Sequence, residues 1–251
     1  MTALTAPRGT LARSGALLSV ALAAATKIQA GALVCANASG YAVNGTAIAG
    51  LTALGRAEQT IDNSAGAAGD ERIDVCPGIF RWNNASSGDA VTLADLGRHA
   101  WIVDNQTVGR TPSASRSPAG VVVDVDGDGV WVRSGPAVPR PQRYVLPLVI
   151  ASLTGAGVYR IVAPVAGTIV AIRSVLAGAL ATGDATVTAS IGGVAVTGGV
   201  LTITQAGSAA GDVDAALPTA ANAVSVGDVI ALTVGGANSA NVGASALIDI
   251  V

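Results

Sequence analysis

Residues 185–196, which read ATVTASIGGVAV, contain the pattern that decides the fold. Before the two glycines, apolar and small polar residues alternate with a period of two, as they do in a β-strand with one buried face. Gly192 and Gly193 then supply a two-residue turn of the kind that joins antiparallel strands. The segment therefore predicts a β-hairpin, and similar short runs ended by turn residues recur along most of the chain.

The rest of the sequence offers many more strand candidates, which predict an all-β fold. The C-terminal half contains Tyr144–Ser152, Gly157–Ala163, Gly167–Ser174, Ala185–Ile191, Val194–Val196, Val200–Ile203, Val229–Val234 and Ala244–Ile250. The N-terminal half contains Leu17–Ala23, Ala32–Ala36, Tyr41–Val43, Gly50–Gln59, Glu71–Val75, Ile79–Asn83, His99–Val103, Gly120–Asp124 and Val130–Arg133. Residues 91–96 (VTLADL) fit either a short strand or one helical turn.

The proline-rich stretch 134–143 (SGPAVPRPQR) is the best domain boundary in the sequence. Proline cannot donate a hydrogen bond to a sheet and stiffens an extended chain, so this stretch predicts a linker. Before it we expect a flexible N-terminal arm at 1–16 and a small β-barrel at 17–133, because Pro-Gly and Asn-rich turns separate the strand candidates there. After it, eight short strands with glycine turns predict a jelly-roll-like β-sandwich at 144–251.

The 251-residue chain is poor in reactive side chains. It has one histidine (His99), one lysine (Lys27) and two cysteines (Cys35 and Cys76), whereas glycine occurs 32 times. It lacks GxSxG, HExxH, a P-loop and a GxGxxG motif followed by a helix, so we expect a structural protein, no enzyme and no cofactor. The net charge is −2 and no basic stripe is present, which argues against nucleic-acid binding.

Charged residues make up only 12% of the chain, so much of its surface must be small and neutral. Such a surface suits a protein that is packed against copies of itself or against partners. After Tyr159 the sequence has no aromatic residue, which leaves a thin core for a free monomer. We therefore predict self-association, as a homotrimer.

Two features of the N-terminal half, the stretch Gly15–Ala25 and the pair of cysteines, leave alternatives open. The stretch Gly15–Ala25 (GALLSVALAAA) is too short to span a bilayer, so no membrane partner is expected. It fits either a signal peptide or the first strand of the barrel. Cys35 and Cys76 fit two buried thiols, or a disulfide if the compartment is oxidising.

Asp124, Asp126 and Asp128, in DVDGDGV, resemble the start of a calcium loop. The glycines between them fit a β-hairpin turn equally well. We expect a hairpin and no metal, and keep the three aspartates as a weak cation-site candidate. His99 is interpreted as structural, although a distant catalytic partner is not excluded by sequence. The three tryptophans, Trp82, Trp101 and Trp131, fit core anchors better than a sugar-binding platform.

Three ordered blocks carry a resemblance to a known family. They are AAATKIQAGALVCANASGYAVNG (23–45), GLTALGRAEQTIDNSAGAAGDERIDVCPGIFRWNN (50–84) and DAVTLADLGRHAWIVDNQTVGRTPSASRSPAGVVVDVDGDGVWV (89–132). Together they cover roughly residues 20–134, and this region resembles tailed-phage and prophage capsid decoration proteins, also called cement or head-fibre proteins. The resemblance rests on the order of the blocks, and none of them is diagnostic alone.

The resemblance implies a β-barrel that binds the outer surface of an expanded phage capsid, commonly as a trimer, and bridges its capsomers. The major capsid protein would be the partner, and the location would be the virion exterior after assembly in the bacterial cytoplasm. The residues 144–251 would face outward. Within the arm, Pro7, Arg8 and Arg13 are the candidates for capsid contact. The alternative is a head fibre or adhesin whose C-terminal domain binds host-surface glycans.

Overall fold

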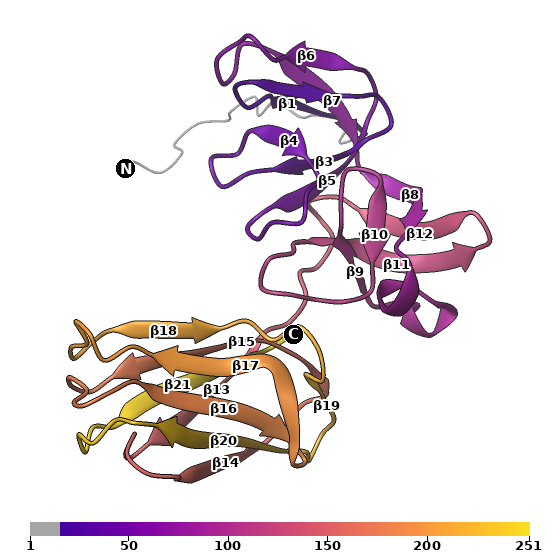
Figure 1. Ribbon diagram of the computed structural model, residues 1–251. Coiled ribbons are helices and arrows are strands. Elements are labelled where there is room, and N and C mark those ends of the chain that lie inside the picture. The colour runs from indigo at the N-terminus through magenta and orange to yellow at the C-terminus, as the bar shows by residue number, and fades with distance from the viewer. Residues whose placement is uncertain (1–15) are drawn as a thin grey trace, which may run out of the picture. The chain divides into compact units, whose positions relative to one another are not determined.

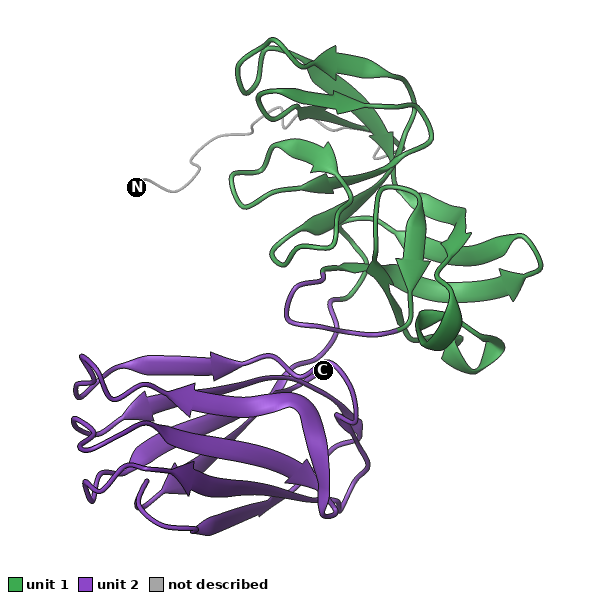
Figure 2. Ribbon diagram, in the orientation of Figure 1, with its two compact units in different colours: residues 1–110, 117–139 green, residues 111–116, 140–251 purple. Residues whose placement is uncertain are grey.

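The computed structural model describes residues 16–251 and shows an all-β protein with a small closed barrel (Figure 1). The chain divides into two compact units (Figure 2). Unit 1 comprises residues 1–110 and 117–139, and unit 2 comprises residues 111–116 and 140–251. Pro7, Arg8 and Arg13, together with nearly all of the predicted arm at 1–16, lie outside the described residues. Within those residues, no helix is long and apolar enough to cross a bilayer.

Unit 1 begins with a five-stranded antiparallel sheet in the order β1-β7-β5-β3-β4, beside a two-stranded sheet β2-β6. The bounds are β1 Leu18–Ala21, β2 Thr26–Ile28, β3 Leu33–Ala36, β4 Ala42–Asn44, β5 Thr52–Ala57, β6 Ile61–Asn63 and β7 Arg72–Cys76. A separate apolar cluster that includes Leu22, Ile28, Val34 and Ile73 fills this part. Strand β1 pairs with β7 and Leu22 is fully buried, so the strand predicted at Leu17–Ala23 is present at Leu18–Ala21.

The second part of unit 1 is a closed five-stranded barrel in the order β10-β8-β12-β11-β9. Its strands are β8 Gly78–Asn84, β9 His99–Ile102, β10 Thr107–Gly109, β11 Pro118–Asp126 and β12 Gly129–Ser134. Two short 3-10 helices, η1 (Ser87–Asp89) and η2 (Leu93–Asp95), lie between β8 and β9. Residues 91–96 therefore form a helical turn and no strand.

The prediction of one barrel over 17–133 is wrong in its extent, because the barrel strands occupy only residues 78–134. Pro77 separates β7 from β8, and a proline cannot continue the hydrogen-bond ladder of the first sheet. The chain then starts a second set of pairings, in which β8 lies between β10 and β12. The apolar cluster of the barrel also includes Leu33, Cys35 and Ala53 from β3 and β5, whereas a second cluster lies within the first sheet and its neighbouring strands.

The start of the predicted linker at 134–143 belongs to the barrel. Ser134 ends β12, and its hydroxyl donates to the carbonyl oxygen of Ala119 at 2.8 Å while the residue is buried. Unit 1 ends at Pro139, inside the predicted stretch. The proline pattern thus marks the region of the boundary, but residue 134 is held by the buried hydrogen bond of its side chain, which sequence does not reveal.

Unit 2 consists of two antiparallel sheets, one in the order β13-β21-β15-β18 and the other in the order β14-β20-β16-β17. The bounds are β13 Tyr144–Ile150, β14 Val158–Val162, β15 Gly167–Leu176, β16 Ala185–Ile191, β17 Val194–Ile203, β18 Val213–Ala216, β19 Ala223–Val224, β20 Val229–Gly236 and β21 Ala244–Ile250. The short β19 pairs with the start of β15. One apolar cluster with members from both sheets fills the space between them, including Ile172, Leu201, Leu232 and Ile248.

The hairpin predicted at 185–196 is confirmed. Ile191 pairs with Val194, and Gly192 and Gly193 have φ angles of 56° and 88°. Positive φ at both central positions fits the twist of the flanking strands and is readily adopted only by glycine or asparagine. Two predicted strands, 194–196 and 200–203, are one strand, β17, with a register shift opposite residues 188–190. Strand β18 was not predicted, because DVDAAL alternates too weakly.

Candidate functional site

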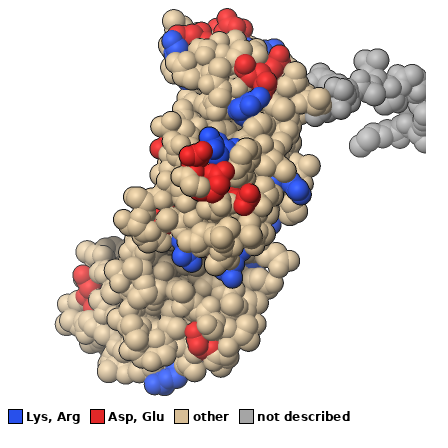
Figure 3. All heavy atoms as spheres, turned by 90° about the vertical axis from the view of Figure 1, so that its right-hand side faces the viewer, with Lys and Arg blue, Asp and Glu red and all other residues tan. Residues whose placement is uncertain are grey.

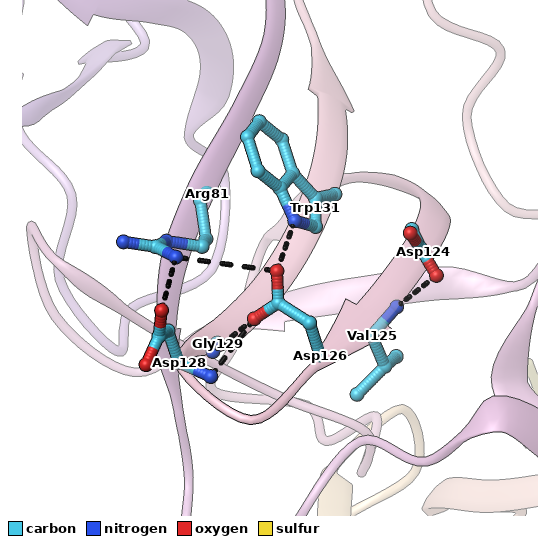
Figure 4. Close-up of polar contacts among 7 residues, drawn as sticks. All are labelled: Arg81, Asp124, Val125, Asp126, Asp128, Gly129 and Trp131. Carbon is cyan, nitrogen blue, oxygen red and sulfur yellow. Dashed lines mark hydrogen bonds and ion pairs between the residues drawn. The ribbon is translucent and has the colours of Figure 1, made fainter.

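The aspartate-rich turn between β11 and β12 contains a network of polar contacts (Figure 4). Asp126 Oδ1 accepts the backbone N–H groups of Asp128 and Gly129 at 2.8 and 2.9 Å. Asp126 Oδ2 accepts the indole N–H of Trp131 at 2.7 Å. From the neighbouring β8, Arg81 forms an ion pair with Asp128 at 2.8 Å, and its guanidinium lies 5.9 Å from the centre of the Trp131 ring.

These contacts make the turn a hairpin and leave the cation-site candidate without support. The hydrogen bonds from Trp131 and from the Asp128 amide lower the pKa of Asp126 and hold it ionised. Asp124 is turned to the backbone N–H of Val125 at 2.8 Å and away from the other two carboxylates (Figure 4). Across residues 16–251, no group of three or more His, Cys, Asp or Glu side chains is arranged to hold a metal ion. The turn is a hydrogen-bonded structural element.

The remaining reactive side chains are engaged in structural contacts. His99 Nε2 lies 2.8 Å from the carbonyl oxygen of Pro139, to which its N–H donates. This bond ties β9 to the last residue of unit 1. Cys35 and Cys76 are free thiols, so the structure has no disulfide between them. Burial raises the pKa of the Cys35 thiol to about 12, which makes it a poor nucleophile.

The tryptophans divide into two groups. Trp82 and Trp101 are 4% and 7% exposed, as predicted for core anchors, and Trp82 belongs to the apolar cluster of the barrel. Trp131 is half-buried, and its ring lies beneath the guanidinium of Arg81. A ring in this position is already covered on one face, so it does not offer the open shelf on which a sugar would stack.

The surface carries few charges, and several of them form ion pairs with neighbours. On the face drawn in Figure 3, charged side chains are scattered among uncharged residues. In unit 2, Arg173 pairs with Asp249 on the outer face of the first sheet. Strands β14, β20, β16 and β17 of the second sheet contain a single charged residue, Arg160. The outward positions of the second sheet are therefore mostly uncharged, and many of them are valine or threonine.

Unit 1 displays two leucines on a locked turn. Leu93 and Leu96 of the η2 turn are 63% and 47% exposed. The turn is held by Asp95, whose buried carboxylate accepts the backbone N–H of Thr92 at 2.8 Å and its hydroxyl at 3.0 Å. This capping box fixes the backbone, so the leucines are not free to turn inward. We call Leu93 and Leu96 the leucine pair.

Unit 2 contains an open polar pocket of about 270 Å³ near one end of β17 and β18. Its lining includes Thr204, Ser208, Asp212 and Asp214. Burial, and then the neighbouring Asp212 carboxylate, raise the pKa of Asp214. Two carboxylates and hydroxyls around a cavity can accept and donate hydrogen bonds to a polar ligand. No aromatic side chain lines the pocket.

No protein-family model matches the sequence, and neither the curated protein sequences nor the solved structures contain a significant match. The site must therefore be interpreted from its own residues. Sequence reasoning missed the leucine pair, because TLADL fits a strand or a turn and does not show which leucines face outward. The Thr92-x-x-Asp95 spacing was the available signal, since an acceptor three residues after a threonine predicts a capped turn.

Proposed function

We propose that the protein is a phage virion structural protein that binds the outer surface of the expanded capsid, bridges its capsomers and acts as a homotrimer. Its partners are then the major capsid protein and further copies of itself, and it performs no catalysis. In this arrangement the N-terminal arm and unit 1 contact the capsid, and the linker connects unit 1 to unit 2. Unit 2 is a jelly-roll-like sandwich that faces outward, and its strand order supports that description.

The observation that carries the proposal is the rigid leucine pair on a surface with little charge. Covering exposed apolar side chains on a fixed backbone is favourable, because their apolar surface is removed from water and little backbone freedom is lost. A stable protein–protein contact buries about 1,200–2,000 Å² in total. The resemblance over residues 20–134 adds the identity of the partner. Many identical contacts on one shell would multiply the effect of each.

Binding to expanded capsids that lack the protein tests this proposal. The full chain should co-sediment with such capsids and raise the temperature at which they rupture. In solution it should have a mass three times the 24.3 kDa of the chain. Absence of binding to both expanded and unexpanded capsids, with a monomeric mass, would contradict the proposal.

Two sets of variants locate the contact. Deletion of residues 2–14 should weaken binding if Pro7, Arg8 and Arg13 contact the capsid. Changing Leu93 and Leu96 together to serine should weaken binding at least tenfold without unfolding unit 1, because both side chains are exposed. The matched control changes Val194 and Val213 of unit 2, which are 64% and 63% exposed, to serine. The control should bind normally, and full binding by both test variants would refute this interface.

The alternative is a head fibre or adhesin whose unit 2 binds host-surface glycans. The polar pocket supports it, because carboxylates and hydroxyls can bind the hydroxyl groups of sugars. The full chain would then bind a defined glycan on an array, and Asp214→Asn together with Asp212→Asn would remove that binding. The leucine-pair variant would retain it, which separates this function from capsid decoration.

A further inference from the structure

The outer edge of β14 is a strand edge to which no other described strand is hydrogen-bonded. Strand β14 lies at the end of its sheet and pairs only with β20, from Val158 opposite Thr233 to Val162 opposite Val229 (Figure 1). An uncovered edge presents unpaired N–H and C=O groups, and these are a template for another strand.

The hydrogen bonds at the two ends of β14 show which groups face outward. Val234 N–H donates to the carbonyl oxygen of Gly157 at 2.8 Å, and Ala163 N–H donates to that of Asp228 at 2.8 Å. In an antiparallel pair the residues that bond to the partner alternate along the strand. Residues 157, 159, 161 and 163 therefore bond to β20. The backbone groups of Val158, Arg160 and Val162 point to the open edge.

The other three sheet edges of unit 2 are each blocked. Strand β13 has Pro147 at its centre, and a proline cannot donate a hydrogen bond. Strand β18 has four residues and is soon followed by Pro218. The edge of β17 is covered near its middle, where Thr197 exchanges two backbone hydrogen bonds with Thr219 and Ala220. Strand β14 has five residues in regular register, with no proline, glycine or bulge.

The side chains along this edge define what a partner strand must offer. Val158 and Val162 are 40% and 57% exposed, and Arg160 between them is also exposed. Within residues 16–251 Arg160 takes part in no ion pair, and its cross-strand neighbour on β20 is Ala231. Residues directly opposite each other in adjacent strands interact, and opposite charges stabilise the pairing. A partner strand would gain most from a carboxylate opposite Arg160 and apolar residues opposite the valines.

We propose that unit 2 accepts an extended segment of another protein as an additional antiparallel strand on β14, with an acidic residue opposite Arg160. A second copy of β14 fits less well, because symmetric pairing would place two Arg160 side chains opposite each other. Backbone hydrogen bonds supply the affinity and the carboxylate fixes the register, as in other cases of strand addition. This inference concerns a different surface from the leucine pair and does not depend on capsid binding.

A capped heptapeptide, Thr-Val-Thr-Glu-Thr-Val-Thr, is the probe. Added to the full chain, it should place its glutamate opposite Arg160 and its valines opposite Val158 and Val162. The measurement is an amide NMR titration, in which the N–H signals of 158, 160 and 162 should shift and exchange more slowly with solvent. N-methylation of the peptide at positions 2, 4 and 6, which face β14, should remove binding. N-methylation at positions 3 and 5 is the matched control and should not.

A charge swap tests the role of Arg160. The same peptide with lysine in place of glutamate should bind the natural chain about three- to tenfold more weakly, because an attractive cross-strand pair becomes a repulsive one. In the Arg160→Glu variant the order of the two peptides should reverse. Val162→Pro should block both peptides, since it removes an outward N–H without breaking a bond to β20, and its melting temperature shows whether unit 2 remains folded.

Three results would overturn the proposal. The first is equal affinity for the two peptides in both the natural chain and Arg160→Glu. The second is loss of binding on methylation of positions 3 and 5 but not of positions 2, 4 and 6. The third is self-association of the full chain that Val162→Pro abolishes, because the edge would then belong to a second copy. Capsid binding by the full chain should be unchanged in Arg160→Glu, which keeps this test separate from that of the proposed function.

Discussion

The two units fill their interiors with different side chains. Unit 1 buries Trp101, and it places Trp82 in the apolar cluster of a barrel whose strands are three to nine residues long. The buried cluster of unit 2 contains only aliphatic side chains, from two sheets whose longest strands have ten residues. A large ring buries more apolar surface than an aliphatic side chain, so Trp82 fills much of the barrel from a single position. The long strands of unit 2 bury apolar surface with many Ile, Leu and Val side chains between two facing sheets.

The two units also differ in the number and placement of their charged side chains. In the sequence, unit 1 carries nine basic and 11 acidic side chains, whereas unit 2 carries five of each. In unit 1, charged side chains form ion pairs at hairpins and turns, such as the pair between Arg81 and Asp128. Unit 2 leaves its sheets almost without charge and places Asp212 and Asp228 at turns, where they accept backbone N–H groups. The two units therefore share the all-β fold class, but unit 1 contains more charged side chains and ion pairs, and the sheets of unit 2 contain few charged residues.

The largest expected effect comes from Ile172→Ala in β15. Ile172 is fully buried in the core of unit 2, so truncation should lower the free energy of unfolding by about 2–5 kcal/mol. Because Trp82, Trp101 and Trp131 all lie in unit 1, tryptophan fluorescence reports that unit alone. We expect a lower calorimetric transition for unit 2 and an unchanged fluorescence transition. Val213→Ala, at a 63% exposed position, is the control, and a parallel fall in fluorescence would show that the units unfold together.

Gly120→Ala should be the next most damaging change, at about 3 kcal/mol in unit 1. Gly120 has a φ of 148° beside a register shift in β11, and an added Cβ would overlap the carbonyl oxygen of Arg133. Gly192→Ala in unit 2 is the matched comparison, since Gly192 has a φ of 56° and open space around it. It should cost about 1 kcal/mol. Urea midpoints measure both, and equal losses would mean that close packing does not matter at Gly120.

Cys35→Ser should cost about 1–2 kcal/mol, because it buries a hydroxyl in an apolar cluster. Cys76→Ser, at a half-buried position, should cost much less. The thiol pKa of Cys35 is raised from 9.0 to about 12 by burial. A raised pKa in the folded state means that its contribution to stability is intact below pH 9 and is lost as the pH rises towards 12. At pH 8 a thiol reagent should label Cys76 first, and rapid labelling of Cys35 before unfolding would contradict this.

The smallest expected effect is that of Asp214→Asn in unit 2. Burial and the Asp212 carboxylate raise the pKa of Asp214, so ionisation is less favourable in the folded protein than in the unfolded chain. The associated stability is present below the ordinary pKa of aspartate and is lost above it. At pH 7 the variant should melt slightly higher, with no gain near pH 3. Asp228→Asn, which weakens the acceptor for Ser225 N–H, is the control and should melt slightly lower.

Local pattern predicted the strands better than their arrangement. Period-two alternation located β16 at its observed bounds, the strand candidate at 244–250 matches β21, and the two glycines located the hairpin turn. Strands of three residues, such as β2, β6 and β10, were missed because so short a segment shows no period. The aspartate-rich turn was correctly predicted as a hairpin, but its bonds to Trp131 and Arg81 join residues from separate strands. The leucine pair and the open edge of β14 depend on which side of a turn or strand faces solvent.

The sequence by itself determined that the chain is all-β, where many of its turns fall and that its surface carries little charge, since all three follow from residue type and spacing along the chain. Only the tertiary structure decided that the barrel begins at Gly78, that the leucines of η2 are exposed and that β14 has no outer partner. These depend on contacts between residues far apart in sequence. Such contacts are set by how the strands pair and how their apolar faces are buried together, which no local pattern records.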